Sequence, residues 1–398
     1  MKKGILLLLA AVLCFGISAC FSDEQPTTSS NPTGTPTVTY PTTNVPTTTK
    51  PIGSTDTNPT VPKPVLTGWD QQGDKWYYYD ENGQMITGFA QIYGAKYYFD
   101  ADGAMHTGWL DLEGQKYYFS AGGVMFKGGL QQEDKQYYFG DDGIMHRGWL
   151  DLEGNRYFMD RDGSMHYGWL TQNEKRYYLK ANGVMAKGML EIDGVKNYFT
   201  GNGEYIRLVN PWNYLEEGYS PELISLSKYV YFANQKVSAE CYDDLMKMLD
   251  DCYRAGHYAI VVSSYRTISY QQGLFNDQVN QFLSWGFSRA EAERRAAQVV
   301  AVPGTSEHHL GLAVDIVDNN WPYLEDEQAN MPAQKWLMAN SWKYGFILRY
   351  PASKTDVTGI IYEPWHYRYV GKELAKELYE SGLTLEEYLN NLTEENKD

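Results

Sequence analysis

Two short segments near the end of the chain, residues 306–315 and 363–366, carry the residue types that could do chemistry. A catalytic zinc takes three protein ligands, mostly imidazole nitrogens and carboxylate oxygens, and keeps one position open for water. His308, Asp315 and His366 supply two imidazoles and one carboxylate. The spacing therefore predicts a zinc site that activates water.

Glu363 stands three residues before His366 and is the candidate base that accepts a proton from the activated water. Three of the seven histidines occupy the same position of an internal repeat and are expected to be architectural: His106, His146 and His166. The chemistry is thus expected in the part of the chain after residue 206.

The pattern resembles the Ser-x-His, six residues, Asp, then distant Glu-x-x-His signature of the D-alanyl-D-alanine carboxypeptidases related to the vancomycin-resistance enzymes. Ser306, His308, Asp315, Glu363 and His366 stand at those positions. The resemblance extends over roughly residues 208–375. It implies that His308, Asp315 and His366 bind zinc and that Glu363 is the general base, and its spacing selects His308 over the neighbouring His309.

The resemblance also implies roles for residues outside the zinc set. Arg266, expected at the end of a strand, would stabilise the oxyanion of the tetrahedral intermediate with its fork of donors. Ser306 and Gln271 would contact the substrate.

The implied reaction is attack of zinc-activated water on the last peptide bond of a peptidoglycan stem peptide, which releases the terminal D-alanine. Two alternatives stay open. The enzyme could be an L,D-carboxypeptidase that acts on tetrapeptide stems, because no residue here decides between the two specificities. The chain could also be a non-catalytic wall-binding adhesin or a zinc-independent scaffold, and the zinc content of the C-terminal half would separate these from an enzyme.

The elements that must position these residues begin after Arg207, where the sequence pattern changes to one typical of mixed helices and strands. Ser238 is expected to begin a helix, residues 259–262 form a short buried strand, and Ser288 with Glu291 predicts a capping box. The two cysteines of the first helix, at positions 241 and 252, are too far apart along it to pair and are expected to be buried free thiols. Residues 207–398 are therefore predicted to be an α+β zinc peptidase domain.

Before this domain, residues 67–206 repeat seven times with a period of twenty. Each unit has glycine at its second position, a tyrosine-rich triplet such as 97–99 and a turn such as Asp102-Gly103. Short aromatic strands separated by Asp-Gly or Asn-Gly turns predict successive β-hairpins that stack into a solenoid. The sequence thus predicts a multidomain protein, with a β-hairpin solenoid array followed by an α+β zinc peptidase domain.

The array resembles the Gly-Trp cell-wall-binding repeats of choline-binding proteins, glucan-binding proteins and clostridial toxins. In choline-binding members an aromatic cage holds the quaternary ammonium group. The candidate wall-ligand residues are Trp69, Trp76, Trp109, Trp149 and Trp169.

The cage wall before the tyrosine triplet is aromatic only in the first unit, where it is Trp76. In the later units it is Lys96, Lys116, Gln136, Arg156, Arg176 and Lys196. A cation in a cage repels a cationic ligand, so the wall polymer that the repeats bind could be choline, a teichoic acid or a glycan.

The N-terminus predicts export. Residues 1–20 read as a signal peptide, and Cys20 after Ile-Ser-Ala resembles the lipobox of bacterial lipoproteins, which implies acylation of that cysteine. The Thr/Pro-rich residues 21–66 are expected to be a disordered linker. A net charge of -16 argues against nucleic acid as a partner. The expected protein is a monomer anchored by lipid to the outer face of the bacterial cytoplasmic membrane and associated with the cell wall.

Overall fold

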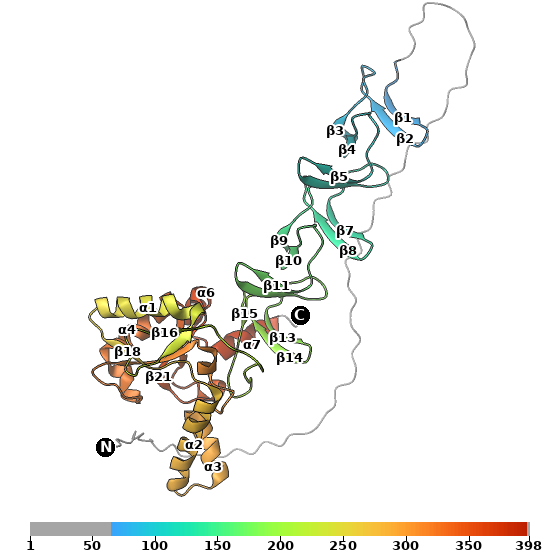
Figure 1. The fold of residues 1–398 in the computed structure, drawn as a ribbon. Helices are drawn as coiled ribbons and strands as arrows, with labels where there is room; N and C mark the ends of the chain where they lie inside the picture. Colours follow the sequence, from blue (N-terminus) through green and yellow to red (C-terminus); the bar gives the residue numbers. More distant parts are fainter. Residues whose placement is uncertain (1–64, 396–398) are drawn as a thin grey trace, which may run out of the picture. The chain divides into compact units, whose positions relative to one another are not determined.

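The computed structural model describes residues 65–395, with side chains up to Thr393 (Figure 1). The predicted signal peptide with Cys20 and nearly all of the predicted linker lie outside the described residues. Within 65–395, no helix is both long and apolar enough to cross a membrane. The described residues form two compact units, one made of 65–170 with Leu179–Met185 and the other of Thr171–Tyr178 with 186–395.

Five successive β-hairpins and the outer residues of a sixth build the first unit, which confirms the predicted array. Each hairpin pairs two antiparallel strands of five residues, with the glycine of the first strand opposite the last residue of the second, as Gly88 lies opposite Phe99. The hairpins of the array are β1 (Gly68–Gln72) with β2 (Lys75–Tyr79), β3 (Gly88–Ile92) with β4 (Ala95–Phe99), β5 (Gly108–Leu112) with β6 (Gln115–Phe119), β7 (Gly128–Gln132) with β8 (Lys135–Phe139), β9 (Gly148–Leu152) with β10 (Asn155–Met159), and β11 (Gly168–Gln172) with β12 (Lys175–Leu179).

An Asp-Gly pair, Asp193-Gly194, forms the tight turn inside the seventh hairpin, but the tight turns inside the first six hairpins are not the ones that the sequence predicted. Tyr93 (φ 49°) and Gly94 (φ 86°) connect β3 to β4, and two successive residues with positive φ form a turn whose twist suits a hairpin. Asp102 and Gly103 instead lie in the connection after β4, where the Gly103 N–H donates to the Asp100 carbonyl at 2.8 Å. The Asp-Gly pair is a turn, but it joins one hairpin to the next.

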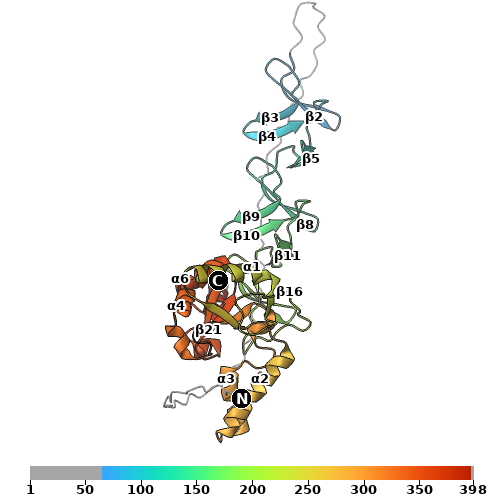
Figure 2. The same cartoon turned by 60° about the vertical axis from the view of Figure 1, so that its left-hand side comes forward.

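Backbone hydrogen bonds join each hairpin to its neighbours. The N–H of Met105 lies 2.7 Å from the carbonyl oxygen of Trp76 in the preceding hairpin, and Met125 makes the equivalent bond to Lys96 at 2.8 Å. Figure 2 shows β5 between the hairpins β3–β4 and β9–β10 along the array. Because a lone hairpin is marginal in water, each one depends on its neighbours for a core.

The seventh hairpin, β13 (Gly188–Ile192) with β14 (Val195–Phe199), adds the short strand β15 (Tyr205–Ile206) and packs within the second unit. The C-terminal helix α7 (Leu385–Glu395) lies against it. The Thr393 hydroxyl accepts a hydrogen bond from the Met189 N–H at 2.7 Å, and the Tyr388 hydroxyl accepts one from the Gly201 N–H at 2.9 Å. The predicted boundary at residue 206 thus separates segments that pack together, and the domain limits stay a prediction.

A four-stranded antiparallel sheet forms the centre of the second unit. Its spatial order is β18 (Ala259–Ser263), β19 (Ala313–Asp318), β21 (Glu363–Tyr369) and β20 (Phe346–Tyr350). All six residues of β19 are buried. Helices pack around this sheet, which confirms the predicted α+β fold.

Two predicted helix starts are correct. The Ser238 hydroxyl accepts from the Glu240 N–H at 3.3 Å, and the Ser288 hydroxyl accepts from the Glu291 N–H at 3.3 Å. The helices are α1 (Ala239–Arg254), α2 (Ile268–Ser284), α3 (Arg289–Val299), α4 (Pro332–Asn340), α5 (Thr355–Thr358) and α6 (Lys372–Ser381), with the 3-10 turns η1 (Glu307–Leu310), η2 (Asp326–Asn330) and η3 (Ser341–Tyr344) and the strand pair β16 (Leu223–Ser225) and β17 (Lys236–Ser238).

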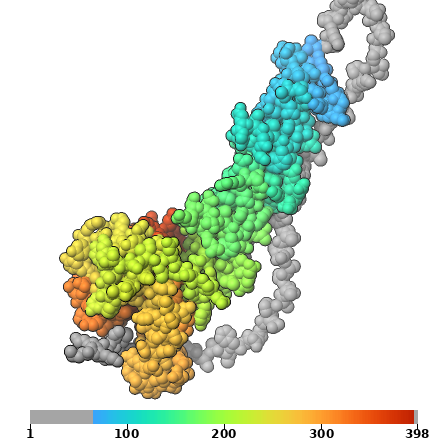
Figure 3. All heavy atoms as spheres, viewed as in Figure 1, coloured from blue at the N-terminus to red at the C-terminus, as the bar shows by residue number. Residues whose placement is uncertain are grey.

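The apolar core of this unit lies between α1 and the sheet. Cys241 and Cys252 of α1 belong to it and are free thiols, as predicted, in the described part of the chain. Helices α2 and α3 form a separate helical hairpin that projects from the body of the unit (Figure 3), with Phe282, Ala292 and Ala296 buried between them.

We expect two truncated chains to differ in stability. A chain that begins at Ala186 keeps the seventh hairpin against α7, whereas one that begins at Arg207 opens the apolar cluster that Tyr198 shares with Leu385 and Leu389. Because full burial of one such leucine is worth about 1.5–3 kcal/mol, the shorter chain should unfold at a clearly lower temperature in calorimetry. Equal melting temperatures for the two chains would contradict this packing role of the hairpin.

Candidate metal centre

The register of the sheet brings the predicted residues together. Asp315 lies on the central strand β19, directly opposite His366 of β21 on one side and Ser263 of β18 on the other. Directly opposed residues of antiparallel strands have their Cβ atoms roughly 4.5–5.5 Å apart. His308 reaches the same point from η1, which immediately precedes β19 in the chain.

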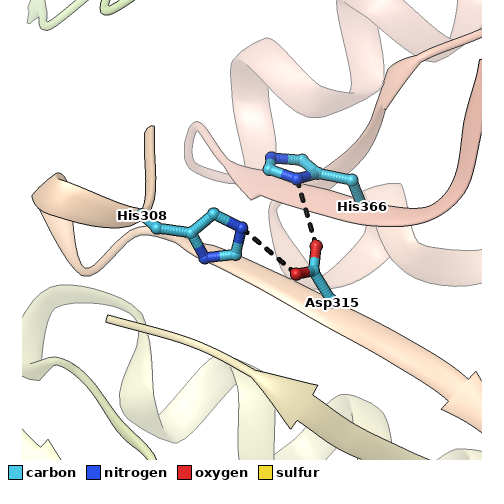
Figure 4. A group of neighbouring side chains, drawn as sticks. All are labelled: His308, Asp315 and His366. Carbon is cyan, nitrogen blue, oxygen red and sulfur yellow. Dashed lines mark ion pairs between the residues drawn. The ribbon is translucent and has the colours of Figure 1, made fainter. Parts of the chain in front are cut away.

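His308, Asp315 and His366 each offer a ligand atom within 4.8 Å of the other two (Figure 4). Nε2 of His308 lies 3.3 Å from Oδ2 of Asp315, and Nδ1 of His366 lies 3.2 Å from Oδ1 of the same carboxylate. All three residues are buried. The structure thus brings together the three residues that the sequence spacing predicted as ligands.

The atoms of this cluster that have no hydrogen-bond partner among the described residues suit a cation. Nδ1 of His308 lies 2.7 Å from the carbonyl oxygen of Ser264 and donates to it, which leaves the lone pair on Nε2. Among the described residues, neither that Nε2 nor Oδ1 of Asp315 has a hydrogen-bond partner. Buried polar atoms without partners are costly, and two imidazoles with one carboxylate are donors that zinc accepts. The residues therefore fit a zinc ion.

Burial and neighbouring charges set the protonation of the cluster. Burial, with the Arg266 guanidinium nearby, lowers the pKa of His308 to about 4, so this imidazole is neutral, the form that binds metals. Burial opposes the charged form of His366 as well, but the neighbouring carboxylates of Asp315 and Glu307 outweigh it and raise its pKa to about 9. A cation held by the cluster would take the place of that proton.

Glu363 lies beside the cluster, with Oε2 at 3.5 Å from Nδ1 of His366. Burial raises its pKa to about 8, and the neighbouring His366 only partly offsets this. The carboxyl group therefore sits near the point at which it can accept and return a proton at neutral pH.

Arg266 follows β18 and points at the carboxylate of Asp315, with Nη2 at 2.6 Å from Oδ2. Its Nε donates to the Ser263 hydroxyl at 2.9 Å, and its Nη1 lies 3.3 Å from the side-chain oxygen of Gln271. Gln271 is fully buried and donates to the Ala301 carbonyl at 2.8 Å. The structure thus places Gln271 behind Arg266 and outside the cavity lining.

A cavity of about 610 Å³ opens beside the cluster. Ser306 lines it, as predicted for a substrate contact, together with Tyr350, Ile360 and Trp365. The sequence analysis missed Glu307, whose Oε2 lies 3.6 Å from Nε2 of His366. Its position one residue before His308 was the only signal that could have pointed to it.

A family model described as D-alanyl-D-alanine carboxypeptidase (VanY) matches residues 234–372, which include the whole cluster. This part of the chain belongs to the VanY family. The repeats match a choline-binding repeat over residues 66–107 and 86–130 and a cell wall binding repeat over 130–145 and 168–185.

Individual VanY-type proteins agree with the family match. The D-alanyl-D-alanine carboxypeptidase of Enterococcus faecalis is 42% identical over 183 residues, which are 46% of this chain and 65% of that protein. The D-alanyl-D-alanine carboxypeptidase of Enterococcus faecium is 31% identical over 202 residues, 48% of this chain and 59% of that protein. The chain thus spans less than two thirds of the length of these relatives.

A solved VanY structure is also similar. A vancomycin-resistance D,D-pentapeptidase variant crystallised in complex with Zn(II) is 42% identical, and the match covers 46% of this chain and 97% of that one with a TM-score of 0.42.

In the repeats outside the VanY domain, the predicted wall-ligand tryptophans lie among other aromatic rings. Trp69 makes edge contacts with Trp76 and Tyr97 at centroid distances of 6.3 and 5.0 Å. In later units a cation lies over the equivalent ring, with the Arg156 guanidinium 4.8 Å from the Trp149 centroid. The corresponding cation is Lys116 at Trp109, at 5.9 Å, and Trp169 is partly exposed.

Two adjacent histidines of the VanY domain should respond differently to mutation. His308→Ala removes a candidate ligand and should abolish stoichiometric zinc binding. His309→Ala should keep the metal, because Nδ1 of His309 is bonded to the Arg266 carbonyl at 2.7 Å and its Nε2 accepts from the Gly304 N–H at 3.2 Å. It should instead cost about 1–3 kcal/mol of stability for each buried group left unpaired.

Metal analysis of the two purified variants, with denaturant unfolding of each, checks this pair. Loss of zinc from His309→Ala, or its retention by His308→Ala, would contradict the ligand assignment.

Proposed function

We propose that this protein is a zinc-dependent D-alanyl-D-alanine carboxypeptidase that removes the terminal D-alanine of peptidoglycan stem peptides and is held at the cell wall by its repeats. The observation that carries the proposal is the convergence of His308, Asp315 and His366 in a buried cluster beside a cavity, within a domain of the VanY family. Wall-binding repeats on the same chain support the same substrate.

His308, Asp315 and His366 would hold the zinc, which supplies a Lewis acid and an acidified water when bound. Glu363 accepts the proton of the attacking water at its carboxylate and returns it to the nitrogen of the departing D-alanine.

Arg266 lines the cavity and its guanidinium is held by three partners, Asp315, Ser263 and Gln271. A fixed cation at this place favours the negative charge that develops on the carbonyl oxygen of the scissile bond. Gln271 contributes by orienting Arg266, and Ser306 contributes a hydroxyl to the lining. The apolar lining residues Ile360 and Trp365 suit the small methyl groups of alanine.

The repeats are proposed to bind a wall polymer, which is choline, a teichoic acid or a glycan. Lysine and arginine over the aromatic faces favour an anionic or hydroxylated polymer beyond the first unit. The chain is proposed to act as a monomer, anchored by an acylated Cys20 to the outer face of the cytoplasmic membrane. Tethering to the wall and the membrane raises the effective concentration of enzyme near its substrate.

Glu363→Gln should separate metal binding from turnover. The amide cannot accept a proton, so cleavage of a pentapeptide ending in D-Ala-D-Ala should fall by roughly 10²–10⁴-fold, while zinc content stays at the level of the unmodified protein. A D-alanine release assay on pentapeptide and tetrapeptide stems, run beside metal analysis, gives both readouts and tells D,D- from L,D-activity. Parallel loss of zinc and activity would make Glu363 a ligand.

Deletion of residues 67–185 should leave catalysis on a soluble stem peptide unchanged, because the seventh hairpin that packs on α7 is retained. Sedimentation with purified walls should fall roughly a hundredfold, as expected when a multivalent tether is removed. If wall binding is unchanged, the array is a spacer.

A further inference from the structure

A chain of buried charges runs behind the metal centre. It begins at Glu307, which is fully buried and has its Oε2 3.6 Å from Nε2 of His366. His366 directs Nδ1 toward Asp315, so its other ring nitrogen is the one that Glu307 meets. The separation is longer than a hydrogen bond, so the contact is electrostatic. A carboxylate beside the second nitrogen of a metal-binding imidazole favours one orientation of the ring and raises its basicity.

Glu307 is itself held from the far side. Its Oε1 accepts from Nε of Arg349 at 2.8 Å and lies 3.1 Å from Nη1 of Arg368. Both arginines are about 1% exposed. Oε1 is therefore committed to the arginines, and Oε2 is left facing His366.

Arg349 continues the chain to the C-terminal helix. Its Nη1 and Nη2 donate to the two carboxylate oxygens of Glu386 in α7 at 2.8 and 2.5 Å. Asn210 adds a hydrogen bond to Glu386 at 3.0 Å. A two-point guanidinium–carboxylate contact fixes the plane of the arginine, and with it the direction of the Nε–H that meets Glu307.

We propose that Arg349 and Glu386 are positioning residues of the metal centre: α7 orients Arg349, Arg349 orients Glu307, and Glu307 orients the ligand His366. The inference rests on the proposed zinc site. Stability of the core alone would not require the charges of Glu307, Arg349 and Glu386, because a buried ion pair adds little stability over apolar side chains of similar size. The same helix is bonded to the seventh hairpin through Tyr388 and Thr393, so the last repeat and the metal centre share one support.

Glu386→Gln in the full-length protein tests the inference, with zinc affinity measured by competition with a chromogenic chelator. Loss of a partner in the outer shell of a metal costs typically about 10–100-fold in affinity. We expect Glu307→Gln to lower the zinc affinity by a factor within that range. Glu386→Gln should lower it by about tenfold, near the lower end of the range.

Two controls separate positioning from simple loss of stability. Glu387→Gln changes the next residue, which pairs with Lys354 at the surface at 2.6 Å, and should leave zinc affinity unchanged. Leu389→Ala opens the apolar contacts of the same helix without touching the charges. It should lower the melting temperature at least as much as Glu386→Gln does, but leave zinc affinity within about twofold of the unmodified protein.

Wild-type zinc affinity in Glu386→Gln would overturn the inference, and so would an equal loss of affinity in Leu389→Ala at matched melting temperature. Neither result would touch the proposed function, which fails on its own if the unmodified protein binds no zinc. If Glu386→Gln does not fold, Arg349→Lys replaces it, because lysine keeps the charge but loses the two-point contact, and the same tenfold loss is expected.

Discussion

A single carboxylate organises the C-terminal half of this molecule. Asp315 lies in the middle of the central strand with about 1% of its surface exposed, and a negative charge buried there needs partners. Arg266, His308 and His366 supply them from three different elements. Because side chains alternate between the faces of a strand, a register slip of one residue would turn Asp315 away from all three. The register of β18, β19 and β21 therefore decides whether Asp315 meets its three partners.

The charge network extends beyond the residues that contact Asp315. The two carboxylates nearest to His366 besides Asp315 differ in what surrounds them: Glu307 is bonded to Arg349, whereas Glu363 lines the cavity. Burial raises the pKa of Glu363, while the two arginines overcome the burial of Glu307 and hold its pKa far below the usual range. The pKa values of these two similar side chains are thus shifted in opposite directions, so that protonation of Glu363 is favoured and Glu307 stays charged.

The parts that the sequence predicted carry a recognisable pattern. The hairpin period and the serine caps of two helices are local patterns, and His308, Asp315 and His366 lie in two short motifs that the resemblance to a known family joins. The buried chain from Glu307 to Glu386 could not be predicted, because its members lie far apart in the sequence and meet only through the sheet and α7. The substrate contact of Gln271 stays a prediction; its amide is hydrogen-bonded to Arg266 and Ala301. The Asp-Gly turns were real, yet their place depended on the stacking of neighbouring hairpins.

The proposed zinc ion is held by two imidazoles and one carboxylate. X-ray absorption at the zinc edge, on the purified protein with one equivalent of zinc, reports on these ligands. We predict a four-coordinate site of nitrogen and oxygen atoms at about 2.0–2.2 Å, with an imidazole signal from two histidines. A sulfur shell near 2.3 Å, or a site with fewer than two imidazoles, would contradict it.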